Sequence, residues 1–185
     1  MNLCAENKKK LCCLRVANLA VNQMNVEKYI EIRNAIPLEK VSCGYRTMTL
    51  FPAAELADAQ VGYSISKSGE DFTGENVGEW KSSWLVIACE DLLGDPFFVD
   101  LNVQELPVFT AAHGETIWNP VLVASSFRDF IQILEIVERI SQGRRNPVEL
   151  ERKPLSDVER RHVLNEIAEQ NGSVSLEYWE SWFEI

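Results

Sequence analysis

The stretch 84-WLVIACEDLLGDPFFVDL-101 contains two apolar runs separated by an acidic turn. The first run, Trp84 to Cys89, is continuous, as expected for a strand that is covered on both faces. The second, Phe97 to Leu101, is aromatic and β-branched and follows Pro96, which suits the start of a strand. The residues between the runs are typical of turns: Glu90, Asp91, Gly94 and Asp95. The stretch therefore predicts a β-hairpin at the centre of one sheet.

Upstream of this hairpin, weak periodicity over residues 1–24 indicates a first helix. Val26 to Asn34 is predicted to form a short helix with Asn25 as its N-cap. Thr47 to Phe51 and Val61 to Ser66 are predicted to be strands. The polar segment from Lys67 to Gly78 is predicted to be a solvated loop, and loops often carry binding specificity.

Downstream of the hairpin, the pattern predicts a strand, a short extended link, a helix with an N-terminal capping motif, a charged linker and two further helical segments. The strand is Leu106 to Ala111, the extended link Pro120 to Val123 and the capped helix Ser126 to Ser141. The charged linker is Arg144 to Pro154, and the last two helical segments are Ser156 to Gly172 and Leu176 to Phe183. The elements together favour an α+β fold: a single domain with a mainly antiparallel sheet of five to six strands, and helices packed on it and at its C-terminal end.

The charge of the chain is unevenly distributed. The 185 residues carry a net charge of −10, and residues 51–135 contain 14 acidic and only 3 basic residues. A surface of this sign repels phosphate backbones and attracts basic proteins. The composition therefore disfavours nucleic-acid binding and favours a basic protein partner.

The cysteine pattern and the absence of long apolar runs favour a cytoplasmic protein. The five cysteines form no C-x-x-C pair, so we expect reduced thiols rather than a disulfide framework or a zinc site. Lys8 to Lys10 precede the apolar segment Leu11 to Val21, but Arg15 and Asn18 interrupt it and no cleavage pattern follows, so no signal peptide is expected. No apolar stretch approaches the roughly 20 residues that a membrane-spanning helix needs.

The central segment resembles the SUKH superfamily, which contains yeast cell-wall-synthesis regulators and many bacterial immunity proteins. The resemblance covers residues 51–140, between a poorly matching N-terminal quarter and a C-terminal helical extension at about 155–185. It rests on an ordered set of motifs: Gly94-Asp95-Pro96, Phe97-Phe98, Asp100, Pro107-Val108, His113-Gly114, Trp118 and Phe127. It implies a non-enzymatic protein that binds and neutralises a cognate toxin, or alternatively a regulatory or scaffolding protein with a housekeeping partner.

Catalytic and metal-binding alternatives have weaker support from the sequence. His113, close to Glu115, is the better of two histidines for a hydrolase site, but no nucleophile motif accompanies it. The carboxylates of Glu90, Asp91, Asp95 and Asp100 match no calcium-loop spacing, and no phosphate-binding loop is present, so no metal or cofactor is expected.

The residues predicted to contact a partner are the charged and polar side chains of the acidic loops. They are Glu70, Asp71, Glu75, Glu90, Asp91, Asp95, His113 and Glu115. We expect them to present a negative field to a basic toxin domain, such as a nuclease, whose phosphate-binding groove an acidic surface can occupy.

Overall fold

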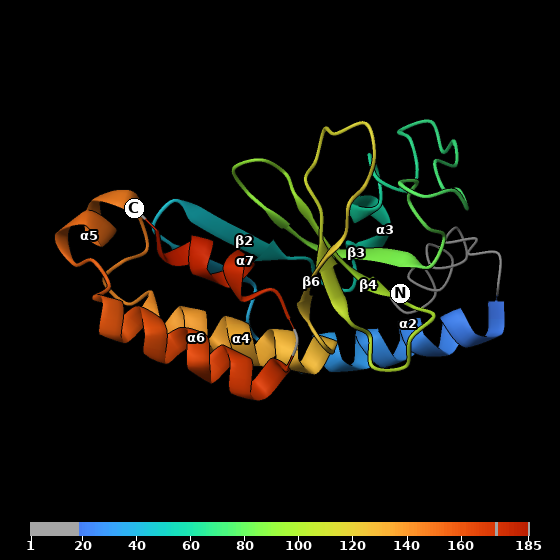
Figure 1. Cartoon of the computed structure of the whole chain (residues 1–185). Coiled ribbons are helices and arrows are strands. Elements are labelled where there is room, and N and C mark those ends of the chain that lie inside the picture. Colours follow the sequence, from blue (N-terminus) through green and yellow to red (C-terminus); the bar gives the residue numbers. More distant parts are fainter. Residues whose placement is uncertain (1–18, 173, 185) are drawn as a thin grey trace, which may run out of the picture.

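The computed structural model describes residues 19–172 and 174–184. At its centre lies a six-stranded sheet in which every strand pairs antiparallel with the next strand along the chain (Figure 1). The strands are β1 (Lys40–Cys43), β2 (Arg46–Leu50), β3 (Trp84–Glu90), β4 (Pro96–Asp100), β5 (Val108–Thr110) and β6 (Val121–Ala124). Because the strands alternate in direction, the β1–β2, β3–β4 and β5–β6 connections leave the sheet at the same end.

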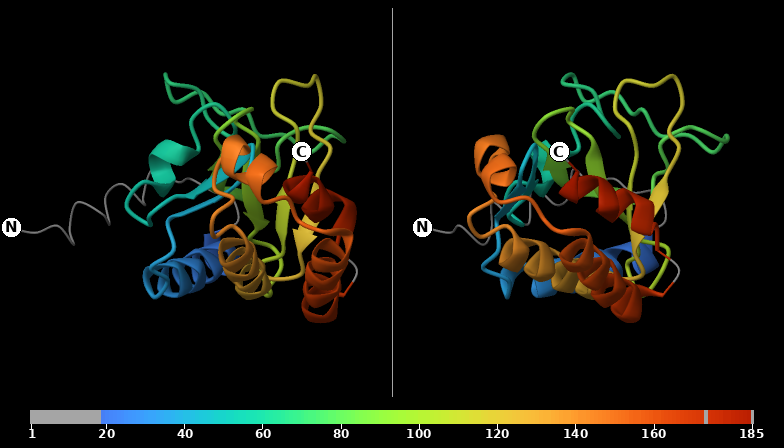
Figure 2. Two further views of the ribbon diagram at one scale, coloured as in Figure 1. Left: turned by 90° about the vertical axis from the view of Figure 1, so that its left-hand side faces the viewer. Right: turned by 60° about the vertical axis from the view of Figure 1, so that its left-hand side comes forward.

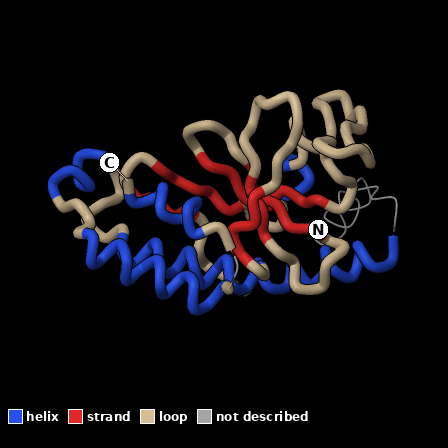
Figure 3. Tube along the Cα trace, in the orientation of Figure 1, coloured by secondary structure: helices blue, strands red, loops and turns tan. Residues whose placement is uncertain are grey.

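The helices occupy mainly one side of this sheet, where α4 and α6 run beside one another and α2 lies near the start of α4, with Tyr29 against Phe127 (Figures 2 and 3). The helical segments are α2 (Leu19–Asn34), α3 (Leu56–Ala59), α4 (Phe127–Ile140), α5 (Pro147–Arg152), α6 (Asp157–Asn171), α7 (Leu176–Glu180) and the 3-10 turn η1 (Ser181–Phe183). The predicted α+β class and the mainly antiparallel sheet are therefore confirmed.

The central hairpin forms as the sequence predicts. β4 begins at Pro96, which lies opposite Cys89 in β3, and Trp84 lies opposite Asp100 at the other end of the pair. A β-bulge at Ile87 shifts the register, so that Ile87 and Ala88 both join the core on the helical side. Residues 85–88 are buried, which confirms that the continuous apolar run is covered on both faces.

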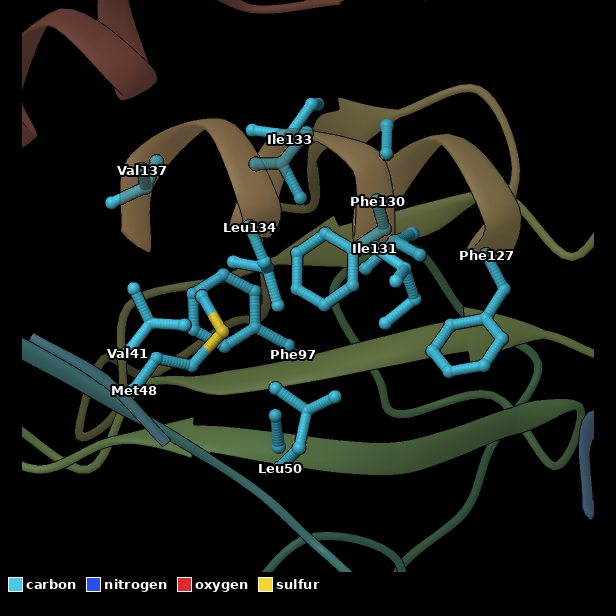
Figure 4. Packing of buried hydrophobic residues seen from close by; sticks show 14 of the residues in the cluster. Val41, Met48, Leu50, Phe97, Phe127, Phe130, Ile131, Ile133, Leu134 and Val137 are labelled. Carbon is cyan, nitrogen blue, oxygen red and sulfur yellow. The ribbon is translucent and has the colours of Figure 1, made fainter. Parts of the chain in front are cut away.

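α4 covers the helical side of the sheet with one apolar face. Its first turn is capped by the hydroxyl of Ser126, which accepts a hydrogen bond from the N–H of Asp129 at 3.1 Å. Phe130 packs on Phe97 of β4, with ring centroids 5.6 Å apart (Figure 4). The C-terminal aromatic residues Trp179 and Trp182 are buried in the same core.

The opposite face of the sheet is covered by the long segment between α3 and β3. Its Trp80 is buried against Phe98, with ring centroids 4.8 Å apart. The side-chain amide of Gln60 donates to the carbonyl and accepts from the N–H of Val86, each at 3.0 Å, which fastens the segment to β3 beside the bulge. Trp84 and Trp118 are partly buried on this face.

Two sequence predictions in the first half of the chain are wrong. Val61 to Ser66 forms a turn with isolated bridges instead of a strand, because the N–H groups of residues 63–65 all donate to the carbonyl of Gln60. Asn25 is not an N-cap: α2 begins at Leu19, and the Asn25 side chain donates to the carbonyl of Leu101 at 2.7 Å. The remainder of the helix predicted within residues 1–24 lies outside the described residues.

Three elements are more regular than the sequence indicates. β1 was not predicted, and the extended link at Pro120 to Val123 is a full strand, β6, paired with β5. The charged linker contains α5, where Pro147 occupies the first turn and the side chain of Asn146 accepts from the N–H of Glu149 at 3.0 Å.

The described residues also bear on the expected chemistry of the chain. Cys43 and Cys89 form no disulfide with another described residue, whereas Cys4, Cys12 and Cys13 lie outside the described part. Within that part, no group of three or more potential metal ligands is assembled, and no helix has both the length and the apolarity to cross a membrane.

Candidate functional site

Residues 91–95 and 111–120 leave the sheet at the same end, and residues 60–83, which cross one face of the sheet, contact both; we call these three segments the loop end (Figures 1 and 2). The hydroxyl of Tyr63 donates to the carbonyl of Gly94 at 2.8 Å. The N–H of His113 donates to Asp95 Oδ1 at 2.7 Å, and the N–H of Trp118 donates to the carbonyl of Gly78 at 2.8 Å. Each segment is therefore hydrogen-bonded to both of the others.

Local chemistry explains why these loops can approach so closely. Gly78 has φ +85°, and a Cβ placed there would lie 2.7 Å from the side chain of Ile117, so the contact between the two loops requires glycine. Burial raises the pKa of Tyr63 to about 12, which keeps its hydroxyl protonated and able to donate to Gly94.

The structure places the predicted partner-binding residues at or beside the loop end, but they differ in exposure and in the contacts that they make. Most are exposed: Glu70, Asp71, Glu75, Asp91, His113 and Glu115. Asp91 pairs with Lys40 at 2.8 Å and also accepts from Thr49, so part of its charge is compensated. Asp95 is half-buried and holds the backbone of His113.

Two of these residues have clear local roles in shaping the loops. Asp71 Oδ1 accepts from the N–H of Thr73 at 2.8 Å and stabilises a turn. The ring of His113 lies 5.7 Å from Tyr63 and 6.1 Å from Trp118, measured between centroids, so aromatic contacts fix its position. Glu70, Glu75 and Glu115 are also exposed.

Glu90 differs from the other predicted residues because its side chain is buried. It lines a pocket of about 210 Å³ beside the loop end, together with Tyr45, Arg46, Leu92, Leu93, Ser181, Trp182 and Glu184. The β1–β2 and β3–β4 turns and η1 each contribute to its walls. Tyr45, Leu92 and Leu93 are 52, 67 and 65% exposed, so apolar side chains surround its entrance.

The inner part of this pocket contains a polar atom without a hydrogen-bond partner among the described residues. Glu90 is 2% exposed, and its Oε2 has no hydrogen-bond partner among the described residues. Burial raises the pKa of Glu90, and the nearby guanidinium of Arg46 partly opposes this effect. The indole N–H of Trp182 lies against the hydroxyl of Tyr178, and this contact partly opposes the burial that raises the pKa of Tyr178. A buried polar atom without a partner, such as Glu90 Oε2, is uncommon in native proteins and requires an explanation.

The sequence did not indicate the pocket, because its residues come from three distant parts of the chain. Arg46, Glu90 and Trp182 are brought together only by the pairing of β2 with β3 and by the packing of η1. One local signal was present: Glu90 lies two residues after Ala88, so strand periodicity directs both side chains to the same face. A charged residue that strand periodicity places on the same face as a buried residue is unusual, and this was the local signal for the pocket.

No protein-family model, no curated protein and no solved structure matches the chain. Membership of the SUKH superfamily therefore stays a prediction from the ordered motifs around the central hairpin. The fold and the geometry of the loop end are independent of that prediction.

Proposed function

We propose that the chain is a non-enzymatic binding protein that captures a basic protein domain at its loop end, as an immunity protein of the SUKH type captures a toxin. The observation that carries this proposal is the concentration of carboxylates on mutually bonded loops. Residues 60–83, 91–95 and 111–120 together contain seven acidic residues and two lysines. Such a surface attracts a partner of opposite charge and speeds their association.

The acidity is arranged on loops whose positions are fixed. The hydrogen bonds from Tyr63, His113 and Trp118 tie the three segments together, so less conformational entropy is lost when a partner binds. A basic groove that binds nucleic acid is a suitable counterpart, because it already carries the lysines and arginines that contact phosphates. Binding there would inhibit by covering the groove, and no bond is made or broken.

The same surface suits a regulatory or scaffolding protein, so the nature of the partner decides between the two functions. The partner is isolated with the tagged full chain from the organism that encodes it and is then expressed alone in a bacterial host. An immunity function predicts that the partner alone arrests growth and that co-expression of the chain restores it. A harmless partner would support the regulatory alternative instead.

The role of the loop end is tested with the triple variant Glu70→Lys, Asp71→Lys and Glu75→Lys. All three side chains are exposed, and only the turn hydrogen bond from Thr73 to Asp71 is lost, so the variant should fold and yet lose protection of the host. Substrate turnover that requires His113 would replace the proposal with the hydrolase alternative.

A matched control separates the loop end from net charge. Glu135, Glu151 and Glu169 are exposed residues of α4, α5 and α6, and their reversal to lysine changes the total charge by the same amount. The control variant should still protect the host. Equal loss of protection in both variants would contradict a specific role for the loop end.

A further inference from the structure

We infer that the pocket beside the loop end receives one basic side chain, preferably an arginine, from the bound protein. This inference rests on the proposed function and assigns the anchor point within it. The argument combines the size of the pocket, its charge and the surroundings of its entrance.

The size of the pocket fits a single side chain. Its volume of about 210 Å³ is below the roughly 300–1,000 Å³ of sites that enclose a drug-sized ligand. Apolar residues surround the entrance, with Leu92 and Leu93 both more than 60% exposed. Exposed apolar residues around a polar centre are the arrangement found at anchor positions of protein interfaces, where the surrounding contacts exclude water.

The charge of the pocket favours a cation. Its lining contains the carboxylates of Glu90 and Glu184 and the single guanidinium of Arg46, which leaves one negative charge without a counterpart in the pocket. Arg46 is also engaged elsewhere, because its guanidinium lies 5.9 Å from the ring centroid of Tyr178. The buried Glu90 Oε2, with no hydrogen-bond partner among the described residues, is therefore the acceptor that an incoming cation would satisfy.

Arginine suits this environment better than lysine. Its planar guanidinium can bond to a carboxylate through two N–H groups and can stack on an aromatic ring. The pocket offers the carboxylate of Glu90 and the rings of Tyr45 and Trp182. Arginine is also enriched among residues that dominate binding energy at protein interfaces.

The test uses the isotope-labelled full chain and two small probes, Nα-acetyl-arginine amide and the isosteric but uncharged Nα-acetyl-citrulline amide. Binding is followed by the nuclear magnetic resonance signals of the Trp182 indole N–H and of the backbone amides of residues 90–93. We expect saturable shifts with the arginine probe, with half-saturation on the order of 1–10 mM for so small a ligand. The citrulline probe should bind at least tenfold more weakly.

Two variants of the protein complete the experiment. Glu90→Gln should weaken binding of the arginine probe at least tenfold, whereas Glu70→Gln removes the same charge from the exposed loop and should change it by less than twofold. If Glu90→Gln does not fold, Glu184→Gln alters an exposed carboxylate of the pocket and should weaken binding about threefold.

Three outcomes would overturn the inference: equal binding of both probes, equal effects of Glu90→Gln and Glu70→Gln, or shifts that spread over the loops without saturation. Failure here is distinguishable from failure of the proposed function. If the arginine probe does not bind the pocket while charge reversal at residues 70, 71 and 75 still abolishes protection, the loop end binds the partner without this anchor. If protection survives the reversal, the proposed function itself is wrong.

Discussion

Replacement of Glu90 by methionine is expected to stabilise the protein. Methionine has a similar unbranched shape but needs no hydrogen bond, and Glu90 is a buried residue with an unpartnered oxygen. A buried polar group without a partner costs about 1–3 kcal/mol, and exchanging buried ionic groups for apolar ones is often neutral or stabilising. The attraction to Arg46 and the hydrogen bond from the N–H of Leu93 are lost as well, but both are smaller effects, because Arg46 is only partly buried and Leu93 is exposed, so that water can replace its partner.

The expected gain in the free energy of unfolding for Glu90→Met is therefore about 1–2 kcal/mol near pH 8. For a chain of this size, each 1 kcal/mol raises Tm by roughly 2–4 °C. Glu184→Met is the matched control, since it removes an exposed carboxylate from the same pocket and should stay within about 0.5 kcal/mol of the wild type.

The gain should depend on pH in a direction that follows from the raised pKa of Glu90. Folding raises this pKa above its ordinary value of 4.5, so the folded wild type binds the proton more tightly than the unfolded chain. The contribution of Glu90 to wild-type stability is then greatest below pH 4.5 and is lost as pH rises through the higher folded pKa. The advantage of Glu90→Met should therefore be small at pH 4 and largest near pH 8.

Urea unfolding at several pH values, followed by tryptophan fluorescence, measures this difference. A loss of more than 1 kcal/mol at pH 8, in a variant that keeps the native fold, would refute the reasoning. It would show that the Glu90 carboxylate is already well satisfied, through Arg46 or through the backbone. The pocket would then contain no unsatisfied acceptor for a cation.

Three further predictions concern the core, the thiols and association. Ile87→Asp places an unpaired charge at a fully buried position and should cost several kcal/mol, so soluble folded protein in a urea titration would contradict the central position of β3. Reductant should leave Tm unchanged if the cysteines are free thiols, and a drop in Tm would show a structural disulfide. The association rate with a basic partner should fall steeply as salt rises and with charge reversal at Glu70, Asp71 or Glu75, while the dissociation rate changes less. An association rate indifferent to both, measured by surface plasmon resonance, would exclude electrostatic capture.

The sequence predicted best those elements whose signals are local. The β3–β4 hairpin follows from two apolar runs around an acidic turn, and α4 follows from the Ser126 cap and a regular apolar face. The predictions failed where a distant contact decides the conformation. Residues 61–66 have the composition of a strand, but Gln60 fastens this segment to Val86 and its carbonyl takes up the amides that a strand would use.

In the candidate site, too, the part with a local sequence signal was predicted and the part that depends on distant contacts was not. The acidic loops were predicted because charge is a property of composition, and composition is visible without a fold. The pocket was not, because its character depends on which face of β3 Glu90 occupies and on what covers that face. Burial at the end of β3 gives the Glu90 carboxyl a raised pKa and leaves one of its oxygens without a partner.

The two parts of the site have complementary physical roles. Exposed carboxylates at the loop end act over about 8 Å at physiological salt, so they guide a basic partner toward the surface but contribute little to holding it. The buried carboxylate of Glu90 is surrounded by Leu92, Leu93 and Tyr45, so a cation must enter the pocket to reach it. Once a cation is there, little water screens the attraction, and the contact holds the partner in place. Substitutions at Glu70 should therefore appear in the association rate and substitutions at Glu90 in the dissociation rate. Such a separation within one interface would show that the pocket retains the partner that the loop end attracts.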